Sequence, residues 1–208
     1  MKYIFVAGAP GSKWSSVVKN IYYSPDIDRS DYRDEWTYYH DASGKRELMH
    51  LGAYFDPGMI SPLPEDLTTL NREQLEKIFT EPFQFKESKG TRIIKSHVFS
   101  NHIDYLQELF PEMPIVIVHR NDDACLGWWV KCGHFDITYP DYHEYFQDLK
   151  TMARIIKHQN KDILEAWWKY TGKVVSDNVQ LAQALNIELP PAEYSQDYAT
   201  SDVRVKVI

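Results

Sequence analysis

Short runs of apolar residues along this chain alternate with segments in which apolar residues recur every three or four positions. The continuous runs predict buried strands at residues 2–7, 91–96, 114–119 and 173–175. The helical spacing predicts helices at residues 14–22, 101–110, 122–131, 142–170 and 178–185. Strands that alternate with helices favour an α/β fold with three layers, in which helices flank a mostly parallel central sheet.

Two segments lack a sustained period. Residues 24–90 are rich in proline, aromatic and charged residues, and they predict a long irregular insertion with one helix near residues 71–79. The segment after Pro190 and Pro191 is also expected to be irregular. Because the chain shows no internal repeat and no low-complexity tract, we expect a single domain over residues 1–208.

The composition is that of a globular protein with many aromatic residues. Of the 208 residues 43% are hydrophobic, and 14 Tyr, 9 Phe and 6 Trp indicate a large core, an aromatic-lined pocket, or both. The 23 Lys and Arg against 30 Asp and Glu leave a net charge of −7, which argues against a general nucleic-acid or anionic-membrane binder. A local basic pocket for a small anion remains compatible with that balance.

Several classes of protein are not expected. No apolar run reaches the roughly 18 residues of a membrane span, so we expect no membrane insertion. The apolar start at residues 3–7 is too short for the core of a signal peptide. Cys125 and Cys132 match neither a zinc-ligand spacing nor a disulfide framework, which favours a reducing cytoplasm as the location.

A glycine-rich turn leads from the first strand into the first helix, with the sequence Gly8-Ala9-Pro10-Gly11-Ser12-Lys13-Trp14-Ser15-Ser16. Backbone N–H groups at a helix start, together with the lysine and the serine hydroxyls, suit a phosphate or a phosphosulfate. The phosphate loop of kinases and NTPases needs Gly-Lys-Ser/Thr, whereas here Ser12 precedes Lys13 and Trp14 follows it. An ordinary strand-to-helix turn is the alternative.

Two further strand ends carry candidate chemistry. Lys95 and His97 are two positions apart, which places both on the same side of their strand; His97 suits a general base, and Lys95 can neutralise developing negative charge. Arg120 ends the third strand and offers a fork of donors to a phosphate, where an NTPase would carry a carboxylate for magnesium. The alternatives are exposed surface groups at the end of the second strand and, for Arg120, an ion pair with Asp122, Asp123 or another surface carboxylate. In a parallel sheet these strand ends converge on the edge where ligands bind.

In this order the segments resemble the PAPS-dependent sulfotransferases, which transfer a sulfuryl group from 3′-phosphoadenosine 5′-phosphosulfate (PAPS). The matching stretches are Ala9 to Ser16 for the family's Pro-Lys-Ser-Gly-Thr-like loop, Ile94-Lys95-Ser96-His97 for its Ile-Lys-Thr-His strand end, and Arg120-Asn121-Asp122-Asp123 for its Arg-Asn-Pro-x-Asp-like turn. The resemblance covers residues 2–22 and 91–190.

The resemblance implies a role for each matching residue. His97 would be the catalytic base, and Lys95 and Lys13 would stabilise developing charge. The cofactor would be held by Pro10, Gly11, Ser12, Lys13, Trp14, Ser15, Ser16, Arg120, Gly127 and Trp128. The product would be PAP (3′-phosphoadenosine 5′-phosphate), no metal is expected, and the acceptor would be a hydroxyl or amine of a small molecule or glycan. The 24–90 insertion would shape the acceptor site.

The chain departs from the family at three places. Gly11 stands where the loop lysine belongs, and Lys13 comes two positions later. Gly127 or Trp128 stands where a serine would bind the 3′-phosphate. The late Arg-Lys-Gly segment of the cytosolic branch is not evident. A metal-dependent P-loop kinase of small molecules and a catalytically inactive nucleotide-binding protein of the same fold therefore remain alternatives.

Aromatic residues provide the last candidates. Trp14 can stack on adenine or belong to the core. An acceptor pocket or the core can account for the remaining aromatic candidates, which are Trp36, Tyr38, Tyr39, Tyr54, Phe55, Trp128 and Trp129. The sequence does not identify the acceptor or the oligomeric state.

Overall fold

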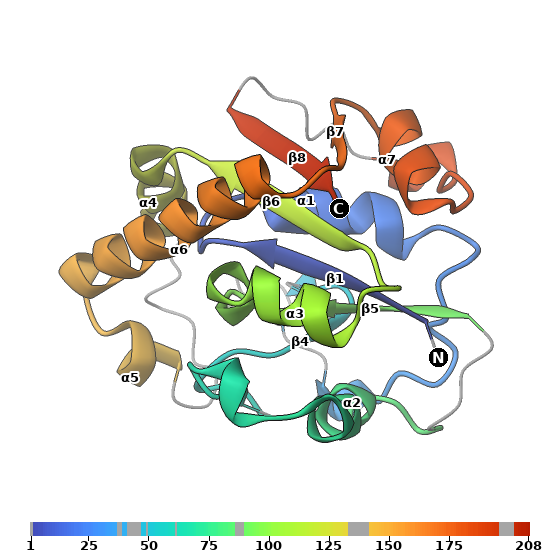
Figure 1. Cartoon of the computed structure of the whole chain (residues 1–208), viewed down its shortest axis with the longest axis horizontal. Helices are drawn as coiled ribbons and strands as arrows, with labels where there is room; N and C mark the ends of the chain where they lie inside the picture. The colour runs from blue at the N-terminus through green and yellow to red at the C-terminus, as the bar shows by residue number, and fades with distance from the viewer. Residues whose placement is uncertain are drawn as a thin grey trace.

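The computed structural model of the chain (Figure 1) describes residues 2–36, 39–40, 47–48, 50–60, 62–85, 90–132, 142–195 and 202–208. The six strands of the main sheet are β1 (Lys2–Gly8), β4 (Ala53–Tyr54), β5 (Thr91–Lys95), β6 (Ile115–Arg120), β7 (Lys173–Val175) and β8 (Val203–Val207). A separate pair is formed by β2 (Tyr39–His40) and β3 (Glu47–Leu48). The helices are α1 (Trp14–Tyr22), α2 (Arg72–Thr80), α3 (Ile103–Leu109), α4 (Asp122–Lys131), α5 (Tyr142–Phe146), α6 (Leu149–Lys169) and α7 (Asn178–Leu185).

The main sheet is mixed but mostly parallel, which confirms the predicted α/β class. Its strand order is β4-β5-β1-β6-β8-β7. The pairs β4–β5, β5–β1 and β1–β6 are parallel, whereas β8 is antiparallel to both of its neighbours. In Figure 1, α3 and α6 lie in front of the sheet and α1 lies behind it. The predicted arrangement of helices around a sheet is therefore present.

The C-terminal segment is where the sequence-based prediction was wrong. We expected an irregular tail after Pro191, but Val203–Val207 forms β8 between β6 and β7. The register pairs Val205 with Val118 and Arg204 with His119. Valine alternates with charged residues in this segment, which is the two-residue period of a strand. In β8 the side chain of Val205 is fully buried.

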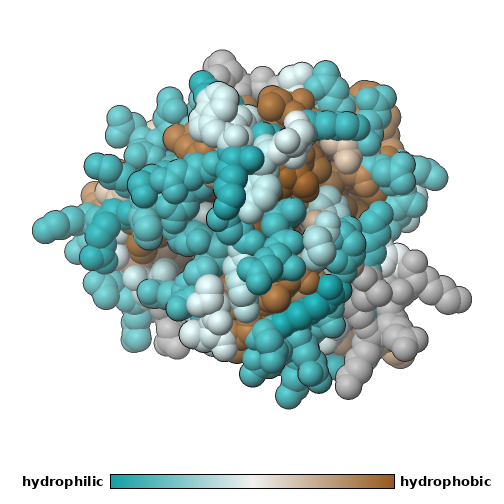
Figure 2. Space-filling view, viewed as in Figure 1, coloured by the Kyte–Doolittle hydropathy of each residue, from teal (hydrophilic) through white to brown (hydrophobic). Residues whose placement is uncertain are grey.

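Aromatic residues form much of the core beside β1. Phe5 lies with its ring centroid 5.2–5.7 Å from the rings of Phe79, Phe99 and Phe110, which come from α2, the short turn at Val98–Asn101, and the end of α3. The large number of aromatic residues in the composition thus serves packing to a substantial extent. Hydrophilic side chains cover most of the face seen in Figure 2, and apolar residues show between them in small areas.

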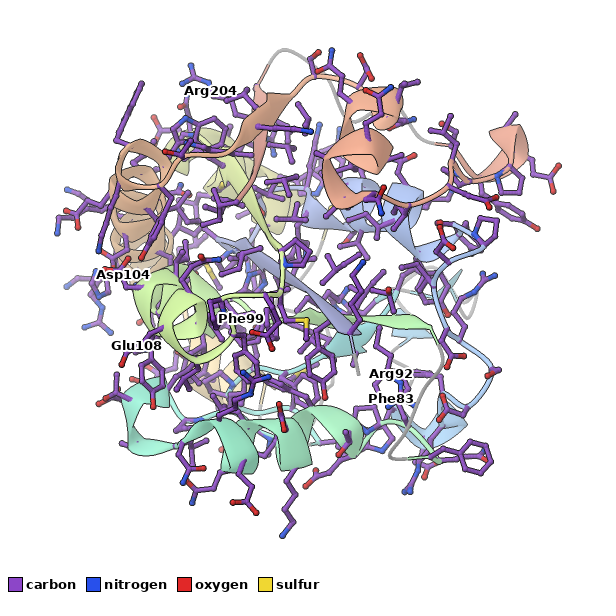
Figure 3. The ribbon with its side chains drawn as sticks, turned by 45° about the vertical axis from the view of Figure 1, so that its right-hand side comes forward. Phe83, Arg92, Phe99, Asp104, Glu108 and Arg204 are labelled. Carbon is purple, nitrogen blue, oxygen red and sulfur yellow. The ribbon has the colours of Figure 1, made fainter. Side chains whose placement is uncertain are left out.

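A buried ion pair attaches the 24–90 insertion to the sheet. Arg92 of β5 donates from Nη2 to Asp31 Oδ2 at 2.7 Å, and both side chains are buried. The guanidinium also lies 4.0 Å from the centroid of the Phe83 ring, as Figure 3 illustrates for the labelled pair. The helix predicted near residues 71–79 is confirmed as α2, which starts at a capping box formed by Asn71 and Gln74.

The long helix predicted over residues 142–170 is present as two helices. It is interrupted between α5 and α6, where Gln147 adopts a positive φ of 49°. Asp148 then caps α6 by accepting a hydrogen bond from the backbone N–H of Thr151. In the part of the chain that the structure describes, neither these helices nor the others contain an apolar stretch long enough to cross a bilayer.

Candidate functional site

The sheet brings the three predicted strand ends together. β5, β1 and β6 are neighbours and point in the same direction, so their carboxyl ends lie on one edge. That edge carries the Gly8–Ser16 turn after β1, His97 after β5 and Arg120 at the end of β6. The convergence expected from the sequence is confirmed.

The turn after β1 needs glycine because it packs closely against α4. Gly11 has φ of 76°, and a Cβ built on it would lie 2.0 Å from the carbonyl oxygen of Cys125. Lys13, at the start of α1, adopts the left-handed region as well, with φ of 62°. Ser12 is fully buried, and its hydroxyl oxygen has no hydrogen-bond partner among the residues that the structure describes.

His97 contacts the same turn from the neighbouring strand. Its Nδ1 donates to the carbonyl oxygen of Gly8 at 2.5 Å, and its ring stacks on Trp14 with centroids 4.0 Å apart. The ring of Tyr54 lies roughly perpendicular to both stacked rings, with its centroid 5.6 Å from that of Trp14 and 5.9 Å from that of His97. Burial lowers the pKa of His97 below its ordinary 6.5, although Asp56 acts in the opposite direction.

Asp56 is a site residue that sequence reasoning missed. This fully buried carboxylate accepts hydrogen bonds from the Tyr54 hydroxyl at 2.5 Å, the Ser96 hydroxyl at 2.8 Å and the His97 backbone N–H at 2.8 Å. Its Oδ2 also lies 3.9 Å from His97 Nε2. The available signal was an acid two positions after a short β-rich pair, Ala53–Tyr54, in a segment interpreted as irregular.

Lys95 is buried rather than exposed at the strand end. Its Nζ lies 3.4 Å from His50 Nδ1 and 5.4 Å from the ring centroids of both Trp14 and Tyr54. Burial lowers its pKa from 10.5 to about 7, against the opposing effect of Asp56. Lys95 and His97 both contact Trp14, which agrees with their predicted position on one side of the strand.

Arg120 joins the end of β6 to the turn and to the C-terminal segment. Its Nη1 donates to the carbonyl oxygen of Gly11 at 3.1 Å. Its Nε and Nη2 both donate to Asp202 Oδ2, at 2.7 and 2.6 Å. The alternative expected from the sequence, an arginine paired with a surface carboxylate, is therefore present, and the partner is Asp202 rather than Asp122 or Asp123.

Three cations lie within 6 Å of the ring centroid of Trp128 on α4. Lys13 Nζ lies 4.6 Å, Lys131 Nζ 5.5 Å and the Arg120 guanidinium carbon 5.8 Å from the ring centroid. We call Lys13, Arg120, Trp128 and Lys131 the Trp128 cluster. It is a concentration of positive charge in a chain of net charge −7, beside an aromatic ring that is partly exposed.

The other predicted site residues have varied positions. Pro10 and Trp14 are buried, Ser15 and Gly127 are exposed, and Ser16 donates its backbone N–H to the carbonyl of Lys13. Trp14 uses a ring face for His97, as a core residue would. Trp36, Tyr54, Phe55 and Trp129 are buried in the core, and Tyr38 and the side chain of Tyr39 lie outside the described residues.

The described residues include no group of three or more His, Cys, Asp or Glu side chains that could hold a metal ion. Cys125 and Cys132 are free thiols. Comparison with known proteins adds no assignment: no protein-family model, curated protein or solved structure matches this chain. The geometry itself is therefore the basis for any functional conclusion.

Proposed function

We propose that this chain is a sulfotransferase that moves a sulfuryl group from PAPS to a hydroxyl or amine of a small-molecule or glycan acceptor. The observation that carries the proposal is the meeting of two strand ends on one turn. His97 is bonded to the carbonyl of Gly8 and Arg120 to the carbonyl of Gly11, so a general base and a cation flank the same backbone segment. This is the arrangement that the resemblance to PAPS-dependent sulfotransferases implies.

The donor groups around the turn suit a doubly phosphorylated adenosine. The Trp128 cluster supplies three cations and an aromatic face. Lys13, Lys131 and the turn would hold the anionic groups of the nucleotide. Arg120 can receive a phosphate only in exchange for Asp202, since that carboxylate now accepts its Nε and Nη2.

His97 has the protonation state that a general base needs. Because the Gly8 carbonyl can only accept, Nδ1 carries the proton and Nε2 is the basic nitrogen. The lowered pKa keeps the ring neutral at pH 7, and the Asp56 carboxylate at 3.9 Å favours the imidazolium that forms when Nε2 takes the acceptor's proton. PAPS supplies the sulfuryl group, and nearby cations stabilise the charge that develops, with losses of about 10²–10³ in rate expected for a missing donor.

One observation favours a second candidate, a nucleotide-binding protein that does not catalyse transfer. The His97 side chain is only 5% exposed and one of its faces is covered by Trp14. A base must reach its proton directly or through one water, so in this candidate the imidazole would serve only to join β5 to the turn.

Calorimetric titration with PAP and with Mg-ATP, followed by assays of PAP release from PAPS, tests the proposal. The acceptor panel would contain phenols, aliphatic alcohols, amines and mono- and disaccharides. Saturable PAP binding and acceptor-dependent PAP release by the wild-type protein support a sulfotransferase. PAP binding without any turnover supports the second candidate, and binding of Mg-ATP alone would replace both with a kinase.

The His97→Ala variant separates binding from chemistry. We expect it to lose transfer while it keeps PAP affinity, because His97 is bonded to the turn rather than placed among the cations of the Trp128 cluster. The exposed Lys77→Ala variant in α2 is the matched control and should keep both properties. Unchanged turnover in His97→Ala would remove this residue from the mechanism.

A further inference from the structure

A groove whose lining includes none of the residues of the Trp128 cluster lies beside α6. It has a volume of about 1100 Å³ and runs between α6 and the start of α4. His119 and Arg120 are consecutive in β6, so their side chains point to opposite faces; Arg120 reaches Gly11, whereas His119 lines the groove. The groove is therefore separate from the proposed nucleotide site.

One wall of this groove is a stripe of side chains along α6, made up of Arg154, Lys157, Lys161, Leu164 and Trp168. Their spacing of three or four positions places them on one face of the helix. At 1.5 Å per residue the stripe is about 21 Å long, which matches about six residues of extended peptide. It is basic in its first part and apolar in its last.

Three cations of the groove lack a partner. Arg154, Lys157 and Arg204 form no ion pair and no side-chain hydrogen bond with any residue that the structure describes. Lys161, by contrast, lies 3.2 Å from Glu165. Unpaired cations gathered in one groove of an acidic chain point to an anionic partner.

The floor of the groove and its apolar end impose requirements on a ligand other than negative charge. Asn160 is 2% exposed, and its Nδ2 donates to the Arg120 carbonyl and to Asp122, while its Oδ1 has no hydrogen-bond partner within the described part of the chain. This oxygen calls for an N–H or O–H donor. Trp168 is 81% exposed beside the half-buried Leu164, although tryptophan is among the residues that contribute most to interfaces.

We propose that this groove binds an acidic peptide segment of a partner protein, with its carboxylates on Arg154, Lys157 and Arg204 and an apolar side chain on Leu164 and Trp168. A backbone N–H of the peptide would donate to Asn160 Oδ1. Asp122, Asp123 and Glu165 also line the groove, and they would repel a polymer that carries charge on every unit. That disfavours a sulfated glycan or a nucleic acid and favours a ligand whose charge is confined to one part. The site is independent of sulfuryl transfer.

Fluorescence anisotropy with the intact chain tests this site. The probe is a fluorescein-labelled peptide with a run of glutamates followed by two phenylalanines; companion probes replace the glutamates by lysines or the phenylalanines by serines. We expect saturable binding of the first probe only, weakened about tenfold or more by Lys157→Glu, by Arg204→Glu and by Trp168→Ser. All three residues are exposed, so these changes leave the core intact.

Lys77→Glu and Phe85→Ser are the matched controls, because they alter an exposed lysine of α2 and an exposed aromatic residue outside the groove. Figure 3 shows Arg204 at the opposite end of the molecule from α2. Unchanged binding by these two variants supports the site. Absence of saturable binding, equal losses in the controls, or tighter groove-dependent binding of a heparin oligosaccharide or single-stranded DNA would overturn the proposal.

Discussion

The Nδ1 of His97 donates to the carbonyl oxygen of Gly8, a residue 89 positions earlier in the chain, at 2.5 Å. This contact joins the end of β5 to the turn that follows β1. It fixes the tautomer of the imidazole and leaves Nε2 facing Asp56. A ring placed by sheet pairing is therefore held in one orientation by a backbone group.

The stability of the protein should depend on the glycine in the turn after β1, Gly11, and should not depend on the glycine in α4, Gly127. We expect Gly11→Ala to lower the free energy of unfolding by about 2 kcal/mol or more, because alanine at φ of 76° is strained and its Cβ would meet the Cys125 carbonyl at 2.0 Å. Gly127→Ala should instead stabilise the protein by roughly 0.5–1 kcal/mol, because it is helical and a Cβ there meets no atom within 4 Å. Urea unfolding of both variants measures this, and equal effects would contradict the close packing of the turn.

The buried lysine should make stability depend on pH. Since the pKa of Lys95 falls from 10.5 in the unfolded chain to about 7 in the fold, the unfolded state binds more protons between these values. The free energy of unfolding should consequently rise as pH increases from about 7, and the penalty is complete below that pH. Denaturant unfolding between pH 7 and 9.5 should show this rise in wild-type protein.

Lys95→Met should abolish that pH dependence, because methionine has a similar shape and does not titrate. Lys77→Met, which changes an exposed lysine of α2, should keep it. A flat profile in wild-type protein, or an unchanged rise in Lys95→Met, would contradict a buried Lys95.

The Arg120–Asp202 pair should compete with a phosphate. If PAP binds as proposed, Asp202→Asn should lower the dissociation constant of PAP roughly three- to tenfold, because the substitution removes a carboxylate that accepts two hydrogen bonds from Arg120. Arg120→Ala should raise the dissociation constant of PAP by about tenfold or more. Calorimetry with PAP reports both changes, and Asp123→Asn, which alters an exposed acid of α4, is the control. Weaker binding in Asp202→Asn would show that this carboxylate supports the site.

The Asp56 carboxylate should be required for the local structure around His97. In Asp56→Ala no acceptor remains for the three groups that donate to this carboxylate, and each buried donor left unpaired costs about 1–3 kcal/mol. Tyr54→Phe removes one donor and leaves the other two bonded, so about 1 kcal/mol is expected. Thermal and urea unfolding measure both, and a smaller loss in Asp56→Ala than in Tyr54→Phe would contradict this hydrogen-bond network.

Four strands of the main sheet, β1, β5, β6 and β7, and the three strand ends were predictable because each depends on a local pattern. Runs such as Ile115 to Val118 are apolar on both faces and lie in the centre of the sheet, and parallel pairing alone then places the ends of β5, β1 and β6 on one edge. Asp56 and Asp202 were not predictable in this way. Each comes from a segment without a sustained period, and each joins the site through a partner at least 40 residues away.

The sequence by itself determined the α/β class, most helices, the main-sheet strands β1, β5, β6 and β7, and the presence of Lys13, Lys95, His97 and Arg120 near one sheet edge, because hydrophobic period and strand direction are local properties. Only the tertiary structure decided which of these groups are buried and what they contact. Lys95 lies near the rings of Trp14 and Tyr54, and Arg120 forms an ion pair with Asp202. These contacts could not be predicted because burial and long-range pairing depend on all the elements that pack together. The side chain of a residue determines which chemistry it can perform, but its surroundings in the fold determine its charge state and its partners.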